Sequence, residues 1–209
     1  MTTDFTHRIA TLDDIPAIRA LMDLSIRELQ KTFLTPEQIE ASYELMGLDT
    51  QLIEDGTYFV IEAADEQQKA STALSALHHS EAEPRPMGSN LIIVGCGGWS
   101  WRNTLFGANH TQGRDASPLD PAKDPARVRA MYTHPDWARR GIGKRIIAIC
   151  EDAARNAGFS KTRLAATLAG RPLYKACGYK DVTPFQATAS NGIEVPLVTM
   201  EKLIHSDFH

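Results

Sequence analysis

A glycine turn at residues 139–144 constrains the fold of this chain more than any other feature of the sequence. The turn reads Arg-Arg-Gly-Ile-Gly-Lys and follows Val128–Thr133, an apolar-rich segment typical of a strand. Apolar residues then recur at helical spacing from Ile142 to Ala157, and Gly158 follows them, so we expect a helix that begins in the turn. The stretch is therefore predicted to fold as strand, turn and helix.

This arrangement is typical of an anion-binding site. The first amides of a helix have no partner within the helix and lie at the positive end of its dipole. Gly141 and Gly143 let the backbone turn tightly and approach a ligand closely. Arg139, Arg140 and Lys144 add positive charge at the same place, and phosphate is the usual ligand of such a turn.

Two better-known phosphate loops do not fit this turn. A P-loop needs glycine where Ala138 stands and serine or threonine where Arg145 stands. A dinucleotide fingerprint needs a third glycine, where Ile146 stands. We reject both interpretations.

The turn instead resembles the cofactor-binding motif of the GNAT N-acetyltransferase superfamily. The resemblance continues through a predicted strand at residues 163–166 to Leu173-Tyr-Lys-Ala-Cys-Gly-Tyr179, which is similar to the family's Leu-Tyr-x-x-x-Gly-Tyr signature. It implies a single α/β domain over residues 1–209, with a central mixed β-sheet flanked by helices. That sheet would be splayed open between its fourth and fifth strands, and acetyl-CoA would sit in the split.

The resemblance also implies which residues bind the cofactor. The pyrophosphate of acetyl-CoA would lie on the backbone of Arg139, Arg140, Gly141, Ile142, Gly143 and Lys144, and the pantetheine arm would pair with the backbone of Met131, Tyr132 and Thr133. The chain departs from the family at Ala138, where arginine or glutamine is frequent. Thr167 stands where many relatives carry an asparagine that contacts the pantetheine arm, so that contact is left in doubt.

Acetyl transfer to an amine needs a neutral amine, a polarised thioester carbonyl and a group that protonates the leaving thiolate. Tyr174 is the candidate for the last role, because a phenol is protonated at neutral pH and the family places its tyrosine acid here. The alternative is that Tyr174 only packs under the sheet. A strand amide near Met131 would polarise the carbonyl. Glu28 and Glu62 are candidate general bases, against the alternative that they are solvated and water carries the proton.

The resulting hypothesis is an enzyme that transfers acetyl from acetyl-CoA directly to a primary amine, with a small-molecule acceptor favoured over a protein. The alternatives are a non-catalytic acyl-CoA sensor or interaction domain, and an enzyme that uses a longer acyl donor. Relatives often dimerise through their last strands, so a homodimer is left open beside the monomer.

Composition argues against other classes of function. A net charge of −4 argues against nucleic-acid binding. We find no apolar run long enough to span a membrane, and the three cysteines have no metal-ligand spacing, so a cytoplasmic location with reduced thiols is expected. The histidines also lack the HExxH spacing, and no metal is predicted.

The rest of the chain supplies the other elements of a mixed layout. Helices are expected after the capping residues at 11–14, from the capping box that begins at Thr35, and at residues 170–176. Strands are expected at residues 7–10, 57–62, 90–101, 161–166, 179–186 and 192–203. Two long connections remain, an extended hairpin connection at about 64–89 and, at 102–125, either a lid over the site or a poorly ordered segment. Trp99 and Trp101 either line an acceptor pocket or belong to the core.

Overall fold

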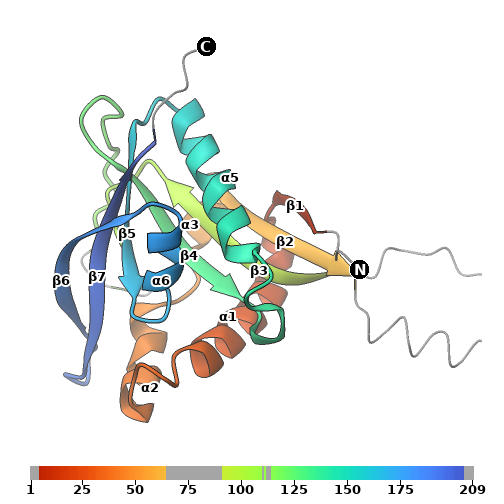
Figure 1. Cartoon of the computed structure of the whole chain (residues 1–209), viewed down its shortest axis with the longest axis vertical. Helices are drawn as coiled ribbons and strands as arrows, with labels where there is room; N and C mark the ends of the chain where they lie inside the picture. The colour runs from red at the N-terminus through yellow and green to blue at the C-terminus, as the bar shows by residue number, and fades with distance from the viewer. Residues whose placement is uncertain (1–4, 65–90, 110, 112–113, 205–209) are drawn as a thin grey trace, which may run out of the picture.

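The computed structural model describes residues 5–64, 91–109, 111 and 114–204. Within these ranges the chain forms a seven-stranded mixed sheet with strand order β1-β2-β3-β4-β5-β7-β6 (Figure 1). The strands are β1 (Thr6–Ile9), β2 (Tyr58–Ala64), β3 (Leu91–Ser100), β4 (Ala126–Thr133), β5 (Lys161–Thr167), β6 (Lys180–Thr188) and β7 (Glu194–Leu203). The helices are α1 (Ile15–Leu29), α2 (Pro36–Leu45), α3 (Thr50–Glu54), α5 (Ile142–Asn156) and α6 (Arg171–Ala176), with short 3-10 turns at Leu12–Asp14 and Pro135–Trp137. The predicted fold class is confirmed.

Helices cover both faces of the sheet. α5 packs through Ile142 and Ile146 on one face, in a core cluster that includes Ile61, whereas α1 packs on the other face in a cluster that includes Val60. Consecutive strand residues point to opposite faces, so these two neighbours in β2 belong to different clusters. A third cluster joins α2 to β6 and β7 through Leu45 and other apolar side chains.

α5 approaches β3 closely because glycines stand where the helix crosses the strand. A Cβ on Gly95 would overlap the side chain of Ile142, and a Cβ on Gly97 would crowd the next turn of the helix. The register between β3 and β4 also shifts between Cys96 and Gly98. These glycines therefore mark both a close approach of the helix and a bulge.

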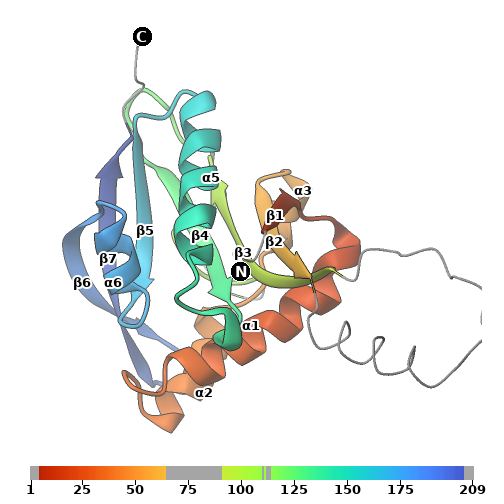
Figure 2. The same ribbon diagram turned by 45° about the vertical axis from the view of Figure 1, so that its right-hand side comes forward.

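The sheet is split between β4 and β5, the fourth and fifth strands. These two parallel strands pair only at Ala126 with Thr162 and at Arg127 with Arg163. Beyond that point β5 continues to pair with β7 along its whole length, while β4 diverges from it toward α1 and α2 (Figure 2). The predicted splay is confirmed, and it opens the middle of the sheet to a ligand.

Three details differ from, or add to, the sequence-based expectations. α3 was not predicted, because five residues are too few to show helical periodicity. Trp99 is only 5% exposed and packs edge-on against Trp101 and Phe159, so the core interpretation of this pair is confirmed and the acceptor-pocket interpretation is wrong. The connection predicted at about 64–89 lies almost entirely outside the described residues, although Ala64 pairs with Leu91 as a hairpin requires.

Candidate functional site

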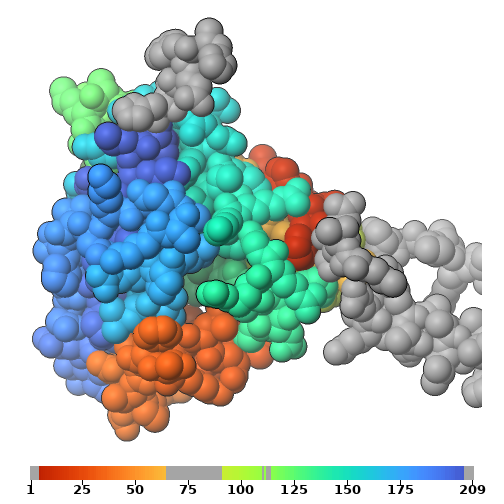
Figure 3. All heavy atoms as spheres, in the orientation of Figure 1, coloured from red at the N-terminus to blue at the C-terminus, as the bar shows by residue number. Residues whose placement is uncertain are grey.

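A cavity of about 820 Å³ occupies the split in the sheet. It is bounded by the β4 backbone, the turn before α5, the end of β5, α6, one face of α1, the end of α2, and residues 105–107 of the long connection. Figure 3 shows a hollow where α2, α6 and the turn before α5 meet. Elements from distant parts of the chain therefore build one site.

The turn before α5 has the conformation that an anion site requires. Gly141 is the residue before the helix and adopts φ 88°, in the left-handed region that favours glycine, and Arg139 also lies in this region at φ 66°. The Arg145 amide donates to the Gly141 carbonyl at 3.0 Å, which is the bond that opens the helix. The amides at 142–144 consequently have no partner within the helix and border the cavity.

The residues of the turn differ in what they contact. Gly143 is needed for packing, because a Cβ there would lie 2.6 Å from the Leu173 side chain in α6. The guanidinium of Arg140 lies over the Trp137 ring, 4.6 Å from its centroid, and Arg140 does not line the cavity. The other predicted cofactor residues, Met131, Tyr132, Thr133, Arg139, Gly141, Ile142, Gly143 and Lys144, all line it.

A bulge in β4 shapes the opposite wall. Ala130 has φ 52°, which an alanine adopts only under constraint. The Tyr58 hydroxyl donates to the Ala130 carbonyl at 2.7 Å and holds this conformation. The bulge turns Met131–Thr133 along the cavity, on the side where β4 has no strand partner. An unpaired strand edge of this kind can pair with an extended ligand.

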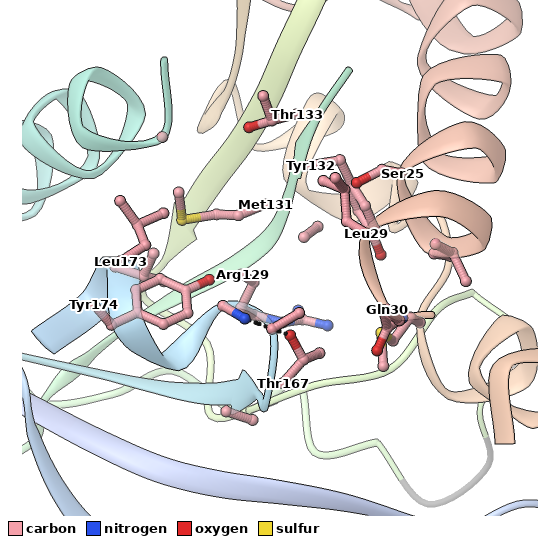
Figure 4. Close-up of a pocket in the computed structure, with 18 of the residues that line it drawn as sticks. Ser25, Leu29, Gln30, Arg129, Met131, Tyr132, Thr133, Thr167, Leu173 and Tyr174 are labelled. Carbon is pink, nitrogen blue, oxygen red and sulfur yellow. Dashed lines mark hydrogen bonds between the residues drawn. The ribbon is translucent and has the colours of Figure 1, made fainter. Parts of the chain in front are cut away.

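Tyr174 lies in α6 with its hydroxyl pointing into the cavity (Figure 4). The residue is 9% exposed, and burial raises the pKa of its phenol well above the ordinary value. Its ring packs edge-on against Tyr179, with 6.0 Å between centroids. In the part of the chain that the structure describes, no protein group hydrogen-bonds this hydroxyl. Tyr174 is therefore both packed and available to a ligand.

The two candidate general bases are not in the site. Glu28 is on the outer side of α1, where it pairs with Lys31 at 2.6 Å. Glu62 pairs with Arg8 at the β1–β2 end of the sheet. Neither lines the cavity: the α1 residues that do are Ser25, Ile26 and Leu29, and no described β2 residue borders it. Glu28 is solvated, as the alternative interpretation has it, whereas the Glu62 side chain is only 13% exposed and held in its ion pair.

Thr167 does line the cavity, at the end of β5. Its hydroxyl accepts a hydrogen bond from the Gly170 amide at 3.0 Å (Figure 4). The residue thus shapes the β5–α6 connection, and its role toward the pantetheine arm stays open.

The first two helices and the connection after β3 form the walls of the far end of the cavity. Ser25, Ile26 and Leu29 share one face of α1 there, and Gln30 and Phe33 follow directly after the helix. Helical spacing would have identified this face, but not that it faces a cavity.

A buried ionic network supports that far wall and was not predicted. The Asp49 carboxylate is fully buried and pairs with Arg129 and Arg114, each at 2.6 Å. Arg129 also donates to the Gly107 carbonyl at 2.9 Å. The described part of the connection at 102–125 is thus an anchored wall of the cavity. No local signal links residues so far apart in the chain.

Other classes of site find no support among the described residues. They contain no group of three or more potential ligands that could hold a metal ion. Cys96, Cys150 and Cys177 are free thiols. His134 caps the short turn at 135–137, where its Nδ1 accepts a hydrogen bond from the Asp136 amide. No helix in the described ranges is long and apolar enough to cross a bilayer.

Residues 92–181 match the family model described as the acetyltransferase (GNAT) domain. The fold is similar to a GCN5-related N-acetyltransferase from Rhodopseudomonas palustris, with TM-score 0.62, 17% identity and coverage of 97% of this chain and 98% of that one. It is also similar to a putative acetyltransferase from Salmonella typhimurium with its cofactor acetyl-CoA, with TM-score 0.55, 14% identity and coverage of 98% and 96%. An N-acetyltransferase from Thermoplasma acidophilum in complex with coenzyme A gives TM-score 0.55, 11% identity and coverage of 96% and 99%. No curated protein matches the sequence.

Proposed function

We propose that this chain is a GNAT acyltransferase that transfers acetyl from acetyl-CoA directly to a primary amine of a small molecule, because residues 92–181 match the GNAT domain and the fold is similar to that of a GCN5-related N-acetyltransferase. The observation that supports this most is that the unpaired edge of β4, the amide-rich turn before α5 and the Tyr174 hydroxyl all border one cavity. The cofactor, the thioester carbonyl and the leaving thiolate each have a candidate group there.

The residues present fit acetyl-CoA. The amides at 142–144 would bind its pyrophosphate, and Arg139 and Lys144 would neutralise the charge. The edge of β4 at Met131–Thr133 would pair with the pantetheine arm, and an amide near Met131 would polarise the thioester carbonyl. When bound, acetyl-CoA supplies the acetyl group and a thiolate leaving group.

The chain's own residues then direct the transfer. The amine nitrogen attacks the carbonyl carbon, so a C–N bond forms and the C–S bond breaks. The Tyr174 hydroxyl donates its proton to the departing sulfur, and water takes a proton from the amine. Burial keeps this phenol protonated by raising its pKa, which suits a general acid.

Calorimetric titration with acetyl-CoA tests the cofactor site without an acceptor. We expect binding in the micromolar range, and a dissociation constant at least about tenfold higher in Gly141→Ala, because alanine at φ 88° costs roughly 1–2 kcal/mol and shifts the amides. Gly192→Ala is the matched control, since that glycine has φ 81°, equally open surroundings and no contact with the cavity. Absence of binding in folded protein would contradict the proposal.

Product detection separates an enzyme from a non-catalytic sensor. Mass spectrometry of N-acylated amines after incubation with acetyl-, propionyl- or succinyl-CoA is expected to show acetyl transfer as the fastest reaction. Binding of acetyl-CoA without any product would favour a non-catalytic acyl-CoA sensor. Faster transfer of succinyl or propionyl would favour an enzyme that uses a longer acyl donor.

A further inference from the structure

The far end of the cavity is walled by apolar side chains. Leu29 comes from α1 and Phe33 from the turn after it, Leu45 and Met46 come from α2 and the residue after it, and Phe106 comes from the connection after β3. Phe33 is 45% exposed although it is a large aromatic residue, and it lies at this wall. Phe106 stacks on Phe185 at 5.7 Å, which fixes its ring. A ligand that enters here exchanges water for apolar contacts.

No carboxylate lines this cavity in the described ranges. Its charged lining residues are Arg129, Arg139 and Lys144, all of them cationic. The nearest acid of the far wall, Asp49, is already shared by two arginines. A second ammonium group on an acceptor would therefore lose its hydration and meet no opposite charge, which is costly.

Two neutral polar side chains face the cavity, Ser25 in α1 and Gln30 directly after it (Figure 4). Ser25 is 7% exposed, and its hydroxyl has no hydrogen-bond partner in the part of the chain that the structure describes. Gln30 is 5% exposed, and its side-chain amide makes only a weak 3.7 Å contact with the sulfur of Met46. Buried polar groups normally have partners, so these two are free to accept an N–H from a ligand.

We propose that the acceptor is a primary monoamine with an apolar alkyl or arylalkyl body, bound as the neutral amine. This inference rests on the proposed function. The apolar wall holds the body, and Ser25 and Gln30 accept hydrogen bonds from the amine. An environment without carboxylates disfavours the ammonium form, so the site itself promotes the deprotonation for which no general base lines the cavity.

A matched pair of acceptors tests the proposal with the full chain. Hexylamine and 1,6-diaminohexane have the same length and differ in the second amine. We expect kcat/KM for acetyl transfer, measured by mass spectrometry of the product, to be at least about 100-fold higher for hexylamine. A preference for the diamine would overturn this inference and leave the proposed acetyl transfer to amines intact. If acetyl-CoA binds but no primary amine of a broad panel is acetylated, both the proposed acetyl transfer to amines and the apolar monoamine acceptor are contradicted.

A pair of variants on the same helix locates the subsite. Leu29→Glu places a carboxylate in the cavity wall. We expect it to lower kcat/KM for hexylamine and to reduce the ratio of kcat/KM for hexylamine to that for 1,6-diaminohexane at least about tenfold. Leu24→Glu is the control, because Leu24 is 41% exposed and does not line the cavity. An unchanged preference in Leu29→Glu, or an equal change in the control, would contradict the assignment.

Discussion

At the scale of single residues, Tyr174 and Tyr179 differ in where their hydroxyl groups lie. Tyr179 is 3% exposed, and its hydroxyl accepts a hydrogen bond from Thr162 at 2.9 Å inside the core. Tyr174 packs against it but directs its hydroxyl into the cavity. Tyr179 therefore belongs to the core. The catalytic role assigned to Tyr174 from the sequence stays a prediction.

We expect Tyr174→Phe to reduce kcat about 100-fold, because general acid catalysis of this kind typically contributes that much or more. The dissociation constant of acetyl-CoA should change less than about threefold, since the ring packing survives. Tyr179→Phe removes a phenol of the same kind from the core and should cost about 1 kcal/mol in urea unfolding without lowering kcat. Equal turnover of Tyr174→Phe and the unmodified protein would disprove the general-acid role.

The pH dependence of the reaction belongs to the same residue. Burial raises the pKa of Tyr174, so the proton that it donates stays in place as the pH rises. We expect kcat/KM to increase with pH as the amine loses its proton, with no decline due to Tyr174 up to about pH 10, the ordinary phenol value. A falling limb near neutral pH that disappears in Tyr174→Phe would contradict this.

At the scale of elements, the cavity depends on how the connection after β3 is tied to the sheet. Arg129 in β4 reaches both Asp49, just before α3, and the Gly107 carbonyl. The Nε of Arg129 has no hydrogen-bond partner among the described residues, and burial lowers the pKa of the guanidinium. The carboxylate of Asp49 is therefore the group that offsets the cost of burying this charge.

We expect Asp49→Asn to lower the free energy of unfolding by about 3 kcal/mol or more, because it leaves a buried guanidinium without its counter-charge. Asp55→Asn is the comparison, since Asp55 pairs with Arg102, which is 28% exposed, and should cost about 1 kcal/mol. Urea titration measures both. In any folded Asp49→Asn protein the KM for the amine should rise more than that for acetyl-CoA, and the reverse order would contradict the link between this network and the far wall.

At the scale of the whole molecule, the split divides the sheet into two groups of strands, which in the described ranges pair with each other only at the start of β4 and β5. Strands β1–β4 carry the bulge, and β5, β7 and β6 form a continuous antiparallel unit. A ligand that fills the split would contact both parts.

Hydrogen exchange measured by mass spectrometry is expected to slow, on addition of acetyl-CoA, at residues 131–133 and at 141–144. Exchange in peptides from β6, and from β7 after Leu197, should be unaffected, because those residues do not border the cavity. Protection spread evenly over the sheet would indicate binding elsewhere or a general stabilisation.

Local patterns were sufficient for much of this architecture. Periodicity, glycine positions and capping residues determined α1, α2, α5 and the strand-turn-helix unit, because those signals act over a few residues. The capping box that begins at Thr35 is present as predicted. The family resemblance added the splay of the sheet and the place of Tyr174.

What only the tertiary structure decided is where side chains from distant segments meet. Arg140 has the same charge as Arg139 beside it, yet its guanidinium lies on Trp137 and not in the cavity. Glu28 and Glu62 are carboxylates on the expected elements but face away from the site. The sequence by itself determined most of the elements and the glycine turn, since these depend on local backbone geometry. The far end of the cavity, with Ser25 and Gln30 in its wall and Asp49 behind it, results from packing between elements that no local pattern encodes.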